Sequence, residues 1–268
     1  MVLPYKSKHS CAGFTLLEVL VVLVMAGLLV TLLLPSLSFM RGLSHRTACS
    51  NNLRQLGIAL FSYQQRHRHI PHASLVRILS NPSQEKRSIE TTWMAILLAD
   101  VDDRGIVNNY NFDWSFDDPA NGTVVGERVG IYLCPAADDE PIDGFGRSNL
   151  VLAGLATAFV DQQQDHRIIV GEIVRNNLGW ARPRATPVAD APNLPYSVFR
   201  PGITPSNTAT QGINVTPTSP DRMEDFYQFS SAHLAGANFL FADGHVMHIA
   251  NSVDQGVLEA MLIPSKQN

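Results

Sequence analysis

The sequence predicts an α+β protein in which a long N-terminal helix packs on a C-terminal domain with an antiparallel β-sheet and long irregular loops. Three observations predict this class: an apolar run near the N-terminus, an amphipathic helical stripe directly after it, and a hairpin signal near the C-terminus. They divide the chain into a short basic N-terminal segment (1–13), a membrane-spanning helix (14–34), an amphipathic extension of that helix (35–67) and a globular domain (68–268).

The composition excludes several classes of protein. The 268 residues carry 20 Lys and Arg against 24 Asp and Glu, a net charge of −4. A nucleic-acid binder would carry a clear basic excess, so we predict no nucleic-acid partner. The 45% hydrophobic content is enough for a core and excludes a disordered chain. Three cysteines are too few for a disulfide scaffold, and they show no Cys-x-x-Cys spacing for zinc.

The segment 14–34 is apolar enough to span a membrane. Glu18 is the only formal charge between Lys8 and Arg41. About 20 apolar residues at 1.5 Å each cover the roughly 30 Å hydrocarbon core. A buried helix of a soluble protein rarely runs this long without a polar face. A cleaved secretory signal would be shorter and would end at a small-residue site, which is missing before Pro35.

Glu18 is the anomaly of this segment. A carboxylate at the centre of a bilayer costs about 2.5–3.5 kcal/mol, so an acid there is first considered functional. If Glu18 lies near the headgroups instead, it reaches water at little cost. The composition alone leaves both interpretations open.

The segment 35–67 predicts an amphipathic helix. Apolar side chains recur at spacings of 4, 3, 4 and 3, at Cys49, Leu53, Leu56, Leu60 and Tyr63. Pro35 predicts a kink, and a break is expected near His67 and Pro71. A continuous rod from residue 14 to about residue 66 would measure on the order of 80 Å. The alternative is a membrane helix followed by a separate short helix.

The domain 68–268 reads as short strands joined by long loops. Segments 130–135 and 167–173 are strand candidates, and 253–263 closes the chain as a helix or a strand. Segment 108–123 is rich in Asn, Asp and Gly and predicts an exposed loop. Segment 182–220 is rich in proline and predicts an irregular excursion.

A hairpin is predicted at 237–250. The pair Asp243-Gly244 lies between alternating apolar residues, which favours a two-residue type I′ turn. In that register Phe241 would face Val246, Leu240 would face Met247 and Phe239 would face His248.

The run Gly-Phe-Thr-Leu-Leu-Glu that begins at Gly13 carries a resemblance. With the basic leader before it, it resembles the cleavage and methylation signal of type IV prepilins and type II secretion pseudopilins. The resemblance implies a pilin-like fold, cleavage by a prepilin peptidase after Gly13 and N-methylation of Phe14. It also implies that Glu18 meets the cationic amine of a neighbouring subunit, which would gain most in a low dielectric.

The same resemblance implies the location and function of the chain. It places the protein in the inner membrane as a single-pass protein, with the N-terminus cytoplasmic and the C-terminal domain periplasmic or in an extracellular fibre. Its partners would be the prepilin peptidase, other pilin or pseudopilin subunits and the membrane. The expected function is a structural subunit of a pilus or pseudopilus. The alternatives are a membrane-anchored binding module that does not polymerise and, third, a tethered extracellular hydrolase.

Four further runs resemble a large bacterial pseudopilin-like family whose function is not established. They are the Cys-Ser-Asn-Asn-Leu run from Cys49, Cys134-Pro135, the Val-Gly-Glu run ending at Glu172, and His233 followed after nine residues by Asp243-Gly244. Two details depart from the family pattern. The usual Asp-Gly-Thr-Ser-Asn-Thr turn is replaced at 161–168, and the usual Arg before His233 is missing.

The candidate chemistry of these residues has two interpretations. His233, Asp243, His245 and His248 could hold a metal ion, but His245 and His248 would lie on opposite faces of a strand. We expect instead that His233 and Asp243 form a structural hydrogen bond, with no metal. The histidine-rich segment 67–72 is expected to be a solvated helix end.

The sequence contains only weak motifs for cofactor binding and none for catalysis. Calcium is a further candidate ion, at the acidic loops containing Asp100, Asp102 and Asp103, and Asp138, Asp139 and Glu140, although neither fits the standard calcium-loop pattern. The sequence has no Gly-x-Ser-x-Gly, His-Glu-x-x-His or phosphate-loop motif. We therefore expect no cofactor and no enzyme activity.

The sequence leaves the redox state of Cys49 and Cys134 open between a disulfide and two thiols. Both would lie outside the membrane, where disulfides persist. A disulfide would close a loop of about 85 residues and contribute roughly 4–5 kcal/mol in the chain-entropy model. Two buried thiols are the equal alternative.

Overall fold

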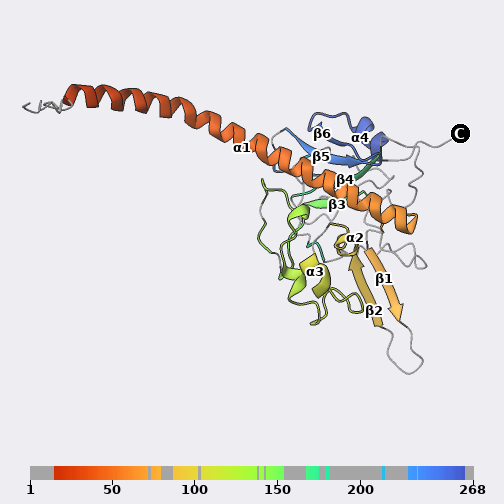
Figure 1. Ribbon diagram of the computed structural model, residues 1–268. Coiled ribbons are helices and arrows are strands. Elements are labelled where there is room, and N and C mark those ends of the chain that lie inside the picture. The colour runs from red at the N-terminus through yellow and green to blue at the C-terminus, as the bar shows by residue number, and fades with distance from the viewer. Residues whose placement is uncertain are drawn as a thin grey trace, which may run out of the picture. The chain divides into compact units, whose positions relative to one another are not determined.

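The computed structural model describes residues 15–71, 74–79, 87–101, 104–137, 139–141, 143–153, 167–174, 179–181, 213–214, 229–233 and 235–262 (Figure 1). The chain forms two compact units, Met1–Ser44 and His45–Asn268. An N-terminal apolar helix followed by short helices and a four-stranded antiparallel sheet makes the protein α+β, as predicted. The prolines of segment 182–220 lie outside the described residues.

Helix α1 runs from Leu16 to His67 without interruption at Pro35. In the first unit, the side chains of Leu16–Leu33 are exposed and, apart from Glu18 and Thr31, apolar. Among the described helices, α1 alone has a segment long and apolar enough to cross a membrane. The angle of a kink at Pro35 is a prediction that the structure does not test.

The second half of α1 buries the predicted stripe. Leu53, Leu56 and Leu60 are fully buried and Cys49 is almost so. The helix ends where expected, because Arg68 takes a positive φ of 67° and its N–H donates to the Gln64 carbonyl, a left-handed C-cap.

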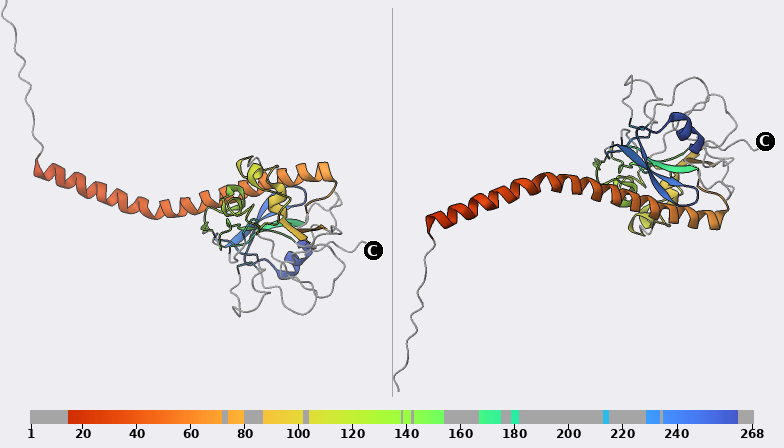
Figure 2. Two further views of the ribbon diagram at one scale, coloured as in Figure 1. Left: turned by 90° about the horizontal axis from the view of Figure 1, so that it is seen from below. Right: turned by 90° about the horizontal axis from the view of Figure 1, so that it is seen from above.

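The main sheet has the order β3 (Leu150–Leu152), β4 (Ile168–Glu172), β5 (Gly236–Phe241), β6 (Val246–Ala250), all antiparallel. Strands β3, β4 and β5 are buried along their whole length. Both views of Figure 2 place helix α4 (Gln255–Leu262) and the His45–His67 part of α1 on opposite sides of this sheet. Because a helix covers each face of the sheet, both faces of these strands are buried, and this explains why their sequences are largely apolar.

Smaller elements complete the domain. Strands β1 (Ser74–Leu79) and β2 (Arg87–Thr92) form a separate two-stranded sheet, in a region from Leu75 that the sequence predicts as strand-like without placing the two strands. Helices α2 (Trp93–Leu97) and α3 (Arg104–Asn109) and the 3₁₀ turns η1 (Val124–Gly126) and η2 (Gly130–Tyr132) follow.

The predicted strand at 130–135 is wrong. Its first half is the 3₁₀ turn η2, closed by the N–H of Tyr132 on the Val129 carbonyl and by the N–H of Leu133 on the Gly130 carbonyl. The backbone of this apolar run is therefore hydrogen-bonded within a turn and not to a neighbouring strand. In contrast, the predicted strand 167–173 is confirmed as β4, and 253–263 contains α4.

The hairpin is confirmed, but its predicted register is wrong by one residue. The structure pairs Leu240 with Val246, Phe239 with Met247 and Asn238 with His248. The N–H of Phe241 donates to the His245 carbonyl, so three residues form the loop instead of two.

The reason for this shift is the backbone of the loop. A type I′ turn needs positive φ at both central residues, and of Asp243 and Gly244 only the glycine has one, at 89°. A three-residue loop with glycine in the left-handed region needs only one such residue. The shift places Asn238 opposite His248, which the predicted register did not.

Segment 108–123 is irregular, as predicted, but it is organised around one buried side chain. The Asn121 side chain accepts from the N–H of Asn111 and donates to the carbonyls of Asn111 and Ser115, and it is fully buried. The amide thereby supplies the hydrogen bonds that a strand or a helix would otherwise give this loop.

Candidate functional site

The N-terminal end of α1 carries the first candidate site. The Thr15 N–H and hydroxyl both donate to the Glu18 carboxylate, at 2.8 and 3.0 Å, and the Glu18 N–H donates to the Thr15 hydroxyl oxygen. This is a capping box, in which the two residues satisfy the free backbone donors of the helix start reciprocally. Glu18 is exposed and has this local role in a single chain. Gly13 and Phe14 lie outside the described residues.

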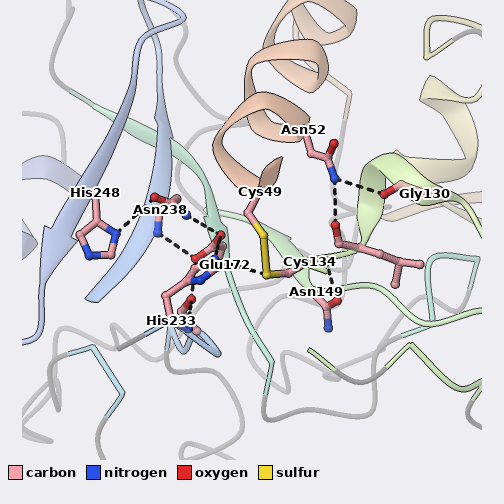
Figure 3. Close-up of a disulfide and its surroundings, with 11 residues drawn as sticks. Cys49, Asn52, Gly130, Cys134, Asn149, Glu172, His233, Asn238 and His248 are labelled. Carbon is pink, nitrogen blue, oxygen red and sulfur yellow. Dashed lines mark hydrogen bonds and ion pairs between the residues drawn. A yellow bond between two sulfur atoms is a disulfide. The ribbon is translucent and has the colours of Figure 1, made fainter. Parts of the chain in front are cut away.

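The second candidate site is a buried polar cluster in the unit His45–Asn268, centred on a disulfide (Figure 3). Cys49 on α1 is bonded to Cys134, which follows η2, with their Cα atoms 5.2 Å apart. Both residues are at least 97% buried. Of the two states that the sequence left open, the structure therefore has the disulfide.

Two asparagines hold the loop that presents Cys134. The Asn52 side chain donates to the carbonyls of Gly130 and Leu133, at 3.2 and 2.9 Å. The buried Asn149 accepts from the Cys134 N–H at 2.9 Å. Because Asn52 is one helical turn after Cys49, the same face of α1 both bonds and positions this loop.

Glu172, at the end of β4, is a fully buried carboxylate beside the disulfide. One oxygen accepts from the Asn238 N–H (2.9 Å) and the Ser231 hydroxyl (2.7 Å), and the other accepts from the Asn238 amide (2.8 Å). Burial alone would raise the pKa of Glu172, but the hydrogen bonds from His233, Asn238 and Ser231 outweigh it and hold the pKa below its usual value. Glu172 is therefore a buried anion.

The imidazole of His233 lies between the carboxylate and the disulfide. Its Nε2 atom is 3.4 Å from the Cys134 sulfur and 3.5 Å from the Glu172 carboxylate. The Ser231 hydroxyl accepts from the His233 N–H at 3.1 Å, so one serine holds both the carboxylate and the loop that carries the histidine.

His248 extends the cluster toward the surface through Asn238. Its Nδ1 atom is 3.2 Å from the Asn238 side-chain oxygen, and the Asn238 amide donates to Glu172. Burial, followed by the positive charge of Arg46, lowers the pKa of His248, while Glu172 acts in the opposite direction. His248 is thereby held neutral more strongly than in a free chain.

The predicted bond between His233 and Asp243 is wrong. Asp243 accepts instead from the backbone N–H of His245 and bonds the ring of that residue, while His233 faces Cys134 and Glu172. The prediction failed because the aspartate bonds locally inside its own turn, as Asx residues in tight turns do. Partial burial acts to raise the pKa of Asp243, but the hydrogen bonds from His245 outweigh it, so the pKa of Asp243 is lowered.

The other sequence candidates lie apart from the cluster. His67 stacks on Tyr63 at the end of α1, with ring centroids 4.2 Å apart. In the acidic segments, Asp100 is paired with Arg66 at 2.6 Å and Asp139 with Arg128 at 2.7 Å. Asp102, Asp103 and Asp138 lie outside the described residues, so calcium binding stays untested.

Two family models match this chain. A family described as "Protein of unknown function (DUF1559)" matches residues 41–168 and 166–256, which is most of the chain. The chain belongs to the DUF1559 family. The prokaryotic N-terminal methylation motif matches residues 8–34, so this DUF1559 member is prepilin-like. No curated protein and no solved structure matches the chain.

The cluster brings together the four runs noted in the sequence of this DUF1559 protein. The runs supply Cys49, Cys134, Glu172 and His233, one residue each, although they are far apart in the chain. Sequence reasoning named Cys49, Cys134 and His233 but missed the role of Glu172. The acid at the end of an apolar strand was the available signal, since a buried carboxylate needs several donors around it.

Proposed function

We propose that this DUF1559 protein is a pilin-like structural subunit that a prepilin peptidase processes and that assembles by helix packing into a pilus or pseudopilus. The methylation motif at residues 8–34 is the observation that carries the proposal. The exposed apolar surface of Leu16–Leu33 supports it, because this surface needs lipid or a neighbouring helix to cover it.

The proposed topology has the N-terminus in the cytoplasm and the unit His45–Asn268 in the periplasm or in a fibre outside the cell. The disulfide between Cys49 and Cys134 supports this orientation, since disulfides persist mainly in oxidising compartments. In this proposal the globular unit has a structural or binding role and no catalytic one.

Glu18 is assigned two successive partners. In the single chain its carboxylate caps the helix through Thr15. In the assembly it faces the amine that cleavage creates on Phe14 of a neighbouring subunit. An opposite charge brought into the low dielectric of a helix bundle stabilises the carboxylate more than a hydroxyl does.

Two matched variants separate these roles. Glu18→Gln keeps the size and an acceptor oxygen but removes the charge, whereas Thr15→Ala removes the two hydrogen bonds of the Thr15 hydroxyl and keeps the charge. We expect Glu18→Gln to lose incorporation into surface fibres, and Thr15→Ala to retain it, as measured by immunoblotting of sheared fibres. Equal incorporation of Glu18→Gln and wild type would contradict the role of Glu18 in assembly, and absence of the wild-type chain from the sheared fibres would favour the anchored module that does not polymerise.

A further inference from the structure

The buried cluster contains more polar chemistry than a structural disulfide requires. A disulfide packs well among apolar groups, whereas a carboxylate and an imidazole are costly to bury. Glu172 and His233 nevertheless lie against it, with side-chain exposures of 1% and 4%. One atom from each of Cys49, Cys134, Glu172 and His233 lies within 4.8 Å of the other three.

We propose that these four residues form a binding site for a soft divalent cation, with Zn²⁺ as the best fit, when the disulfide is reduced. Two thiolates, an imidazole nitrogen and a carboxylate oxygen are a donor set that zinc prefers in proteins. Calcium and magnesium prefer oxygen ligands alone and would be rejected by the two sulfurs.

The distances agree with tetrahedral coordination. With bonds of about 2.0–2.3 Å to zinc, neighbouring ligand atoms lie roughly 3.3–3.8 Å apart. The His233 Nε2 atom lies 3.4 Å from the Cys134 sulfur and 3.5 Å from the Glu172 oxygen. Two of the six edges of the tetrahedron are therefore already formed. The two bonded sulfurs must move apart, and the other three pairs of ligand atoms lie within 4.8 Å of each other.

The groups around the site hold its ligands in place, as in known zinc sites. Ser231 donates to the Glu172 carboxylate. Asn238 also donates to it, and His248 contacts the Asn238 side chain (Figure 3). Asn149 fixes the backbone of Cys134. None of these bonds is made by a sulfur atom, so breaking the disulfide does not itself remove any of them.

The oxidised chain reaches the zinc-bound state in two steps, reduction of the disulfide and binding of the ion. A dithiol reductant transfers two electrons and two protons to the Cys49–Cys134 bond, which breaks into two thiols while the reductant becomes a disulfide. Zn²⁺ then displaces both thiol protons and binds the two thiolates, the carboxylate of Glu172 and the Nε2 atom of His233, whose ring proton moves from Nε2 to Nδ1. Oxidation would reverse both steps and release the ion.

The first test uses the full-length chain in detergent, reduced with a phosphine so that no added thiol competes for metal, and titrated with Co²⁺. We expect one ion per chain, with the sulfur-to-cobalt charge-transfer band and the visible bands of tetrahedral Co²⁺, and loss of both on adding Zn²⁺. The oxidised chain should show neither band. Absence of both bands in the reduced chain would overturn the proposal.

Variants identify the ligands. Cys134→Ser should reduce the charge-transfer band at saturating Co²⁺ by about half or more, because only the Cys49 thiolate remains, and His233→Ala should weaken Co²⁺ binding by about tenfold or more. His245→Ala is the matched control, since this exposed histidine of the same hairpin lies outside the cluster, and it should bind like wild type. Unchanged affinity in His233→Ala would mean that the cysteines bind cobalt without the cluster.

A measurement on the wild type alone covers the case in which variants do not fold. Zn²⁺ binds only the reduced folded state in this proposal, so it should raise the thermal midpoint of the reduced chain and leave that of the oxidised chain unchanged. Equal shifts for both redox states, or no shift for either, would contradict the site.

Discussion

At the scale of single residues, Glu172 decides how the globular unit is built. The carboxylate receives hydrogen bonds from a loop and from β5, and it lies beside the bond that joins α1 to the Cys134 loop. A buried anion of this kind specifies which segments meet, because any other arrangement would leave its charge without donors.

Glu172→Gln should destabilise the folded unit by about 1–3 kcal/mol. The new amide group would point a donor at donors of Asn238 or Ser231 and leave one of them unsatisfied. Denaturant unfolding of the oxidised full chain in detergent measures the loss. The exposed Glu127→Gln is the control and should leave the midpoint unchanged. Equal midpoints for both variants would contradict this role of Glu172.

The lowered pKa of His248 predicts a pH dependence. The unfolded chain takes up a proton near the ordinary histidine pKa of about 6.5, whereas the folded chain does so only at lower pH, so the unfolded state binds more protons in between. The contribution of His248 to stability is therefore complete above about pH 6.5 and is lost as the pH falls toward the folded pKa.

His248→Gln tests this prediction because glutamine does not titrate. The difference in unfolding free energy between wild type and variant should be constant above about pH 6.5 and should shift in favour of the variant below it. Unfolding curves at several pH values measure the difference. A difference that stays constant through the acid range would show that His248 does not titrate as stated.

Residue roles were only partly predictable. His233 and the two cysteines stood out as isolated chemical groups, but the partner of His233 could not be read from spacing. The Asp243 carboxylate is occupied inside its own turn, and Glu172 reaches His233 only through the pairing of β4 with β5. Such long-range pairing is not encoded in a local pattern.

At the scale of elements, β4 depends on a glycine between two aromatic rings. A Cβ at Gly171 would lie 2.4 Å from an atom of the Phe229 ring and 2.9 Å from one of Phe239. These two rings meet edge to face with centroids 4.9 Å apart. The glycine before Glu172 thus lets the aromatic pair close over the strand that carries the carboxylate.

Gly171→Ala should destabilise the unit by about 1–3 kcal/mol, because the added methyl group overpacks a well-filled core. Gly130→Ala is the matched control, since no atom lies within 4 Å of its added Cβ. Thermal unfolding of both variants measures the difference. Similar midpoints for the two would mean that the rings move aside freely.

Element types were more predictable than their registers. The stripe from Cys49 to Tyr63 gave the second half of α1 because its spacing repeats through four turns. The hairpin signal was equally clear. However, the loop has one residue more than predicted, and this difference changes every cross-strand pair of the hairpin. At 130–135, side-chain amides and the disulfide decide the conformation, and both are non-local.

At the scale of the whole molecule, the chain has two regions with different requirements. The apolar surface of Leu16–Leu33 is exposed and needs a membrane or other helices, whereas the unit His45–Asn268 has its own core. Composition alone predicted the first region. The convergence of four distant runs on one cluster in the second region needed the fold.

The disulfide is the main covalent constraint on the second region. Its removal by Cys49→Ala with Cys134→Ala should lower the unfolding free energy by about 4–5 kcal/mol in the chain-entropy model. Denaturant unfolding of the double variant and of the oxidised wild type, both with a chelator present, measures the change. Equal stability of the two would contradict the chain-entropy model, because it would show that the bond does not restrict the unfolded chain.

Mass spectrometry of the chain purified from its native membrane tests the central claim most directly. A prepilin-like subunit that has been processed begins at Phe14 and carries one methyl group on its terminal amine. The account predicts this N-terminus for the mature protein. A mature chain that still carries the 1–13 segment, with no methyl group on Phe14, would contradict it.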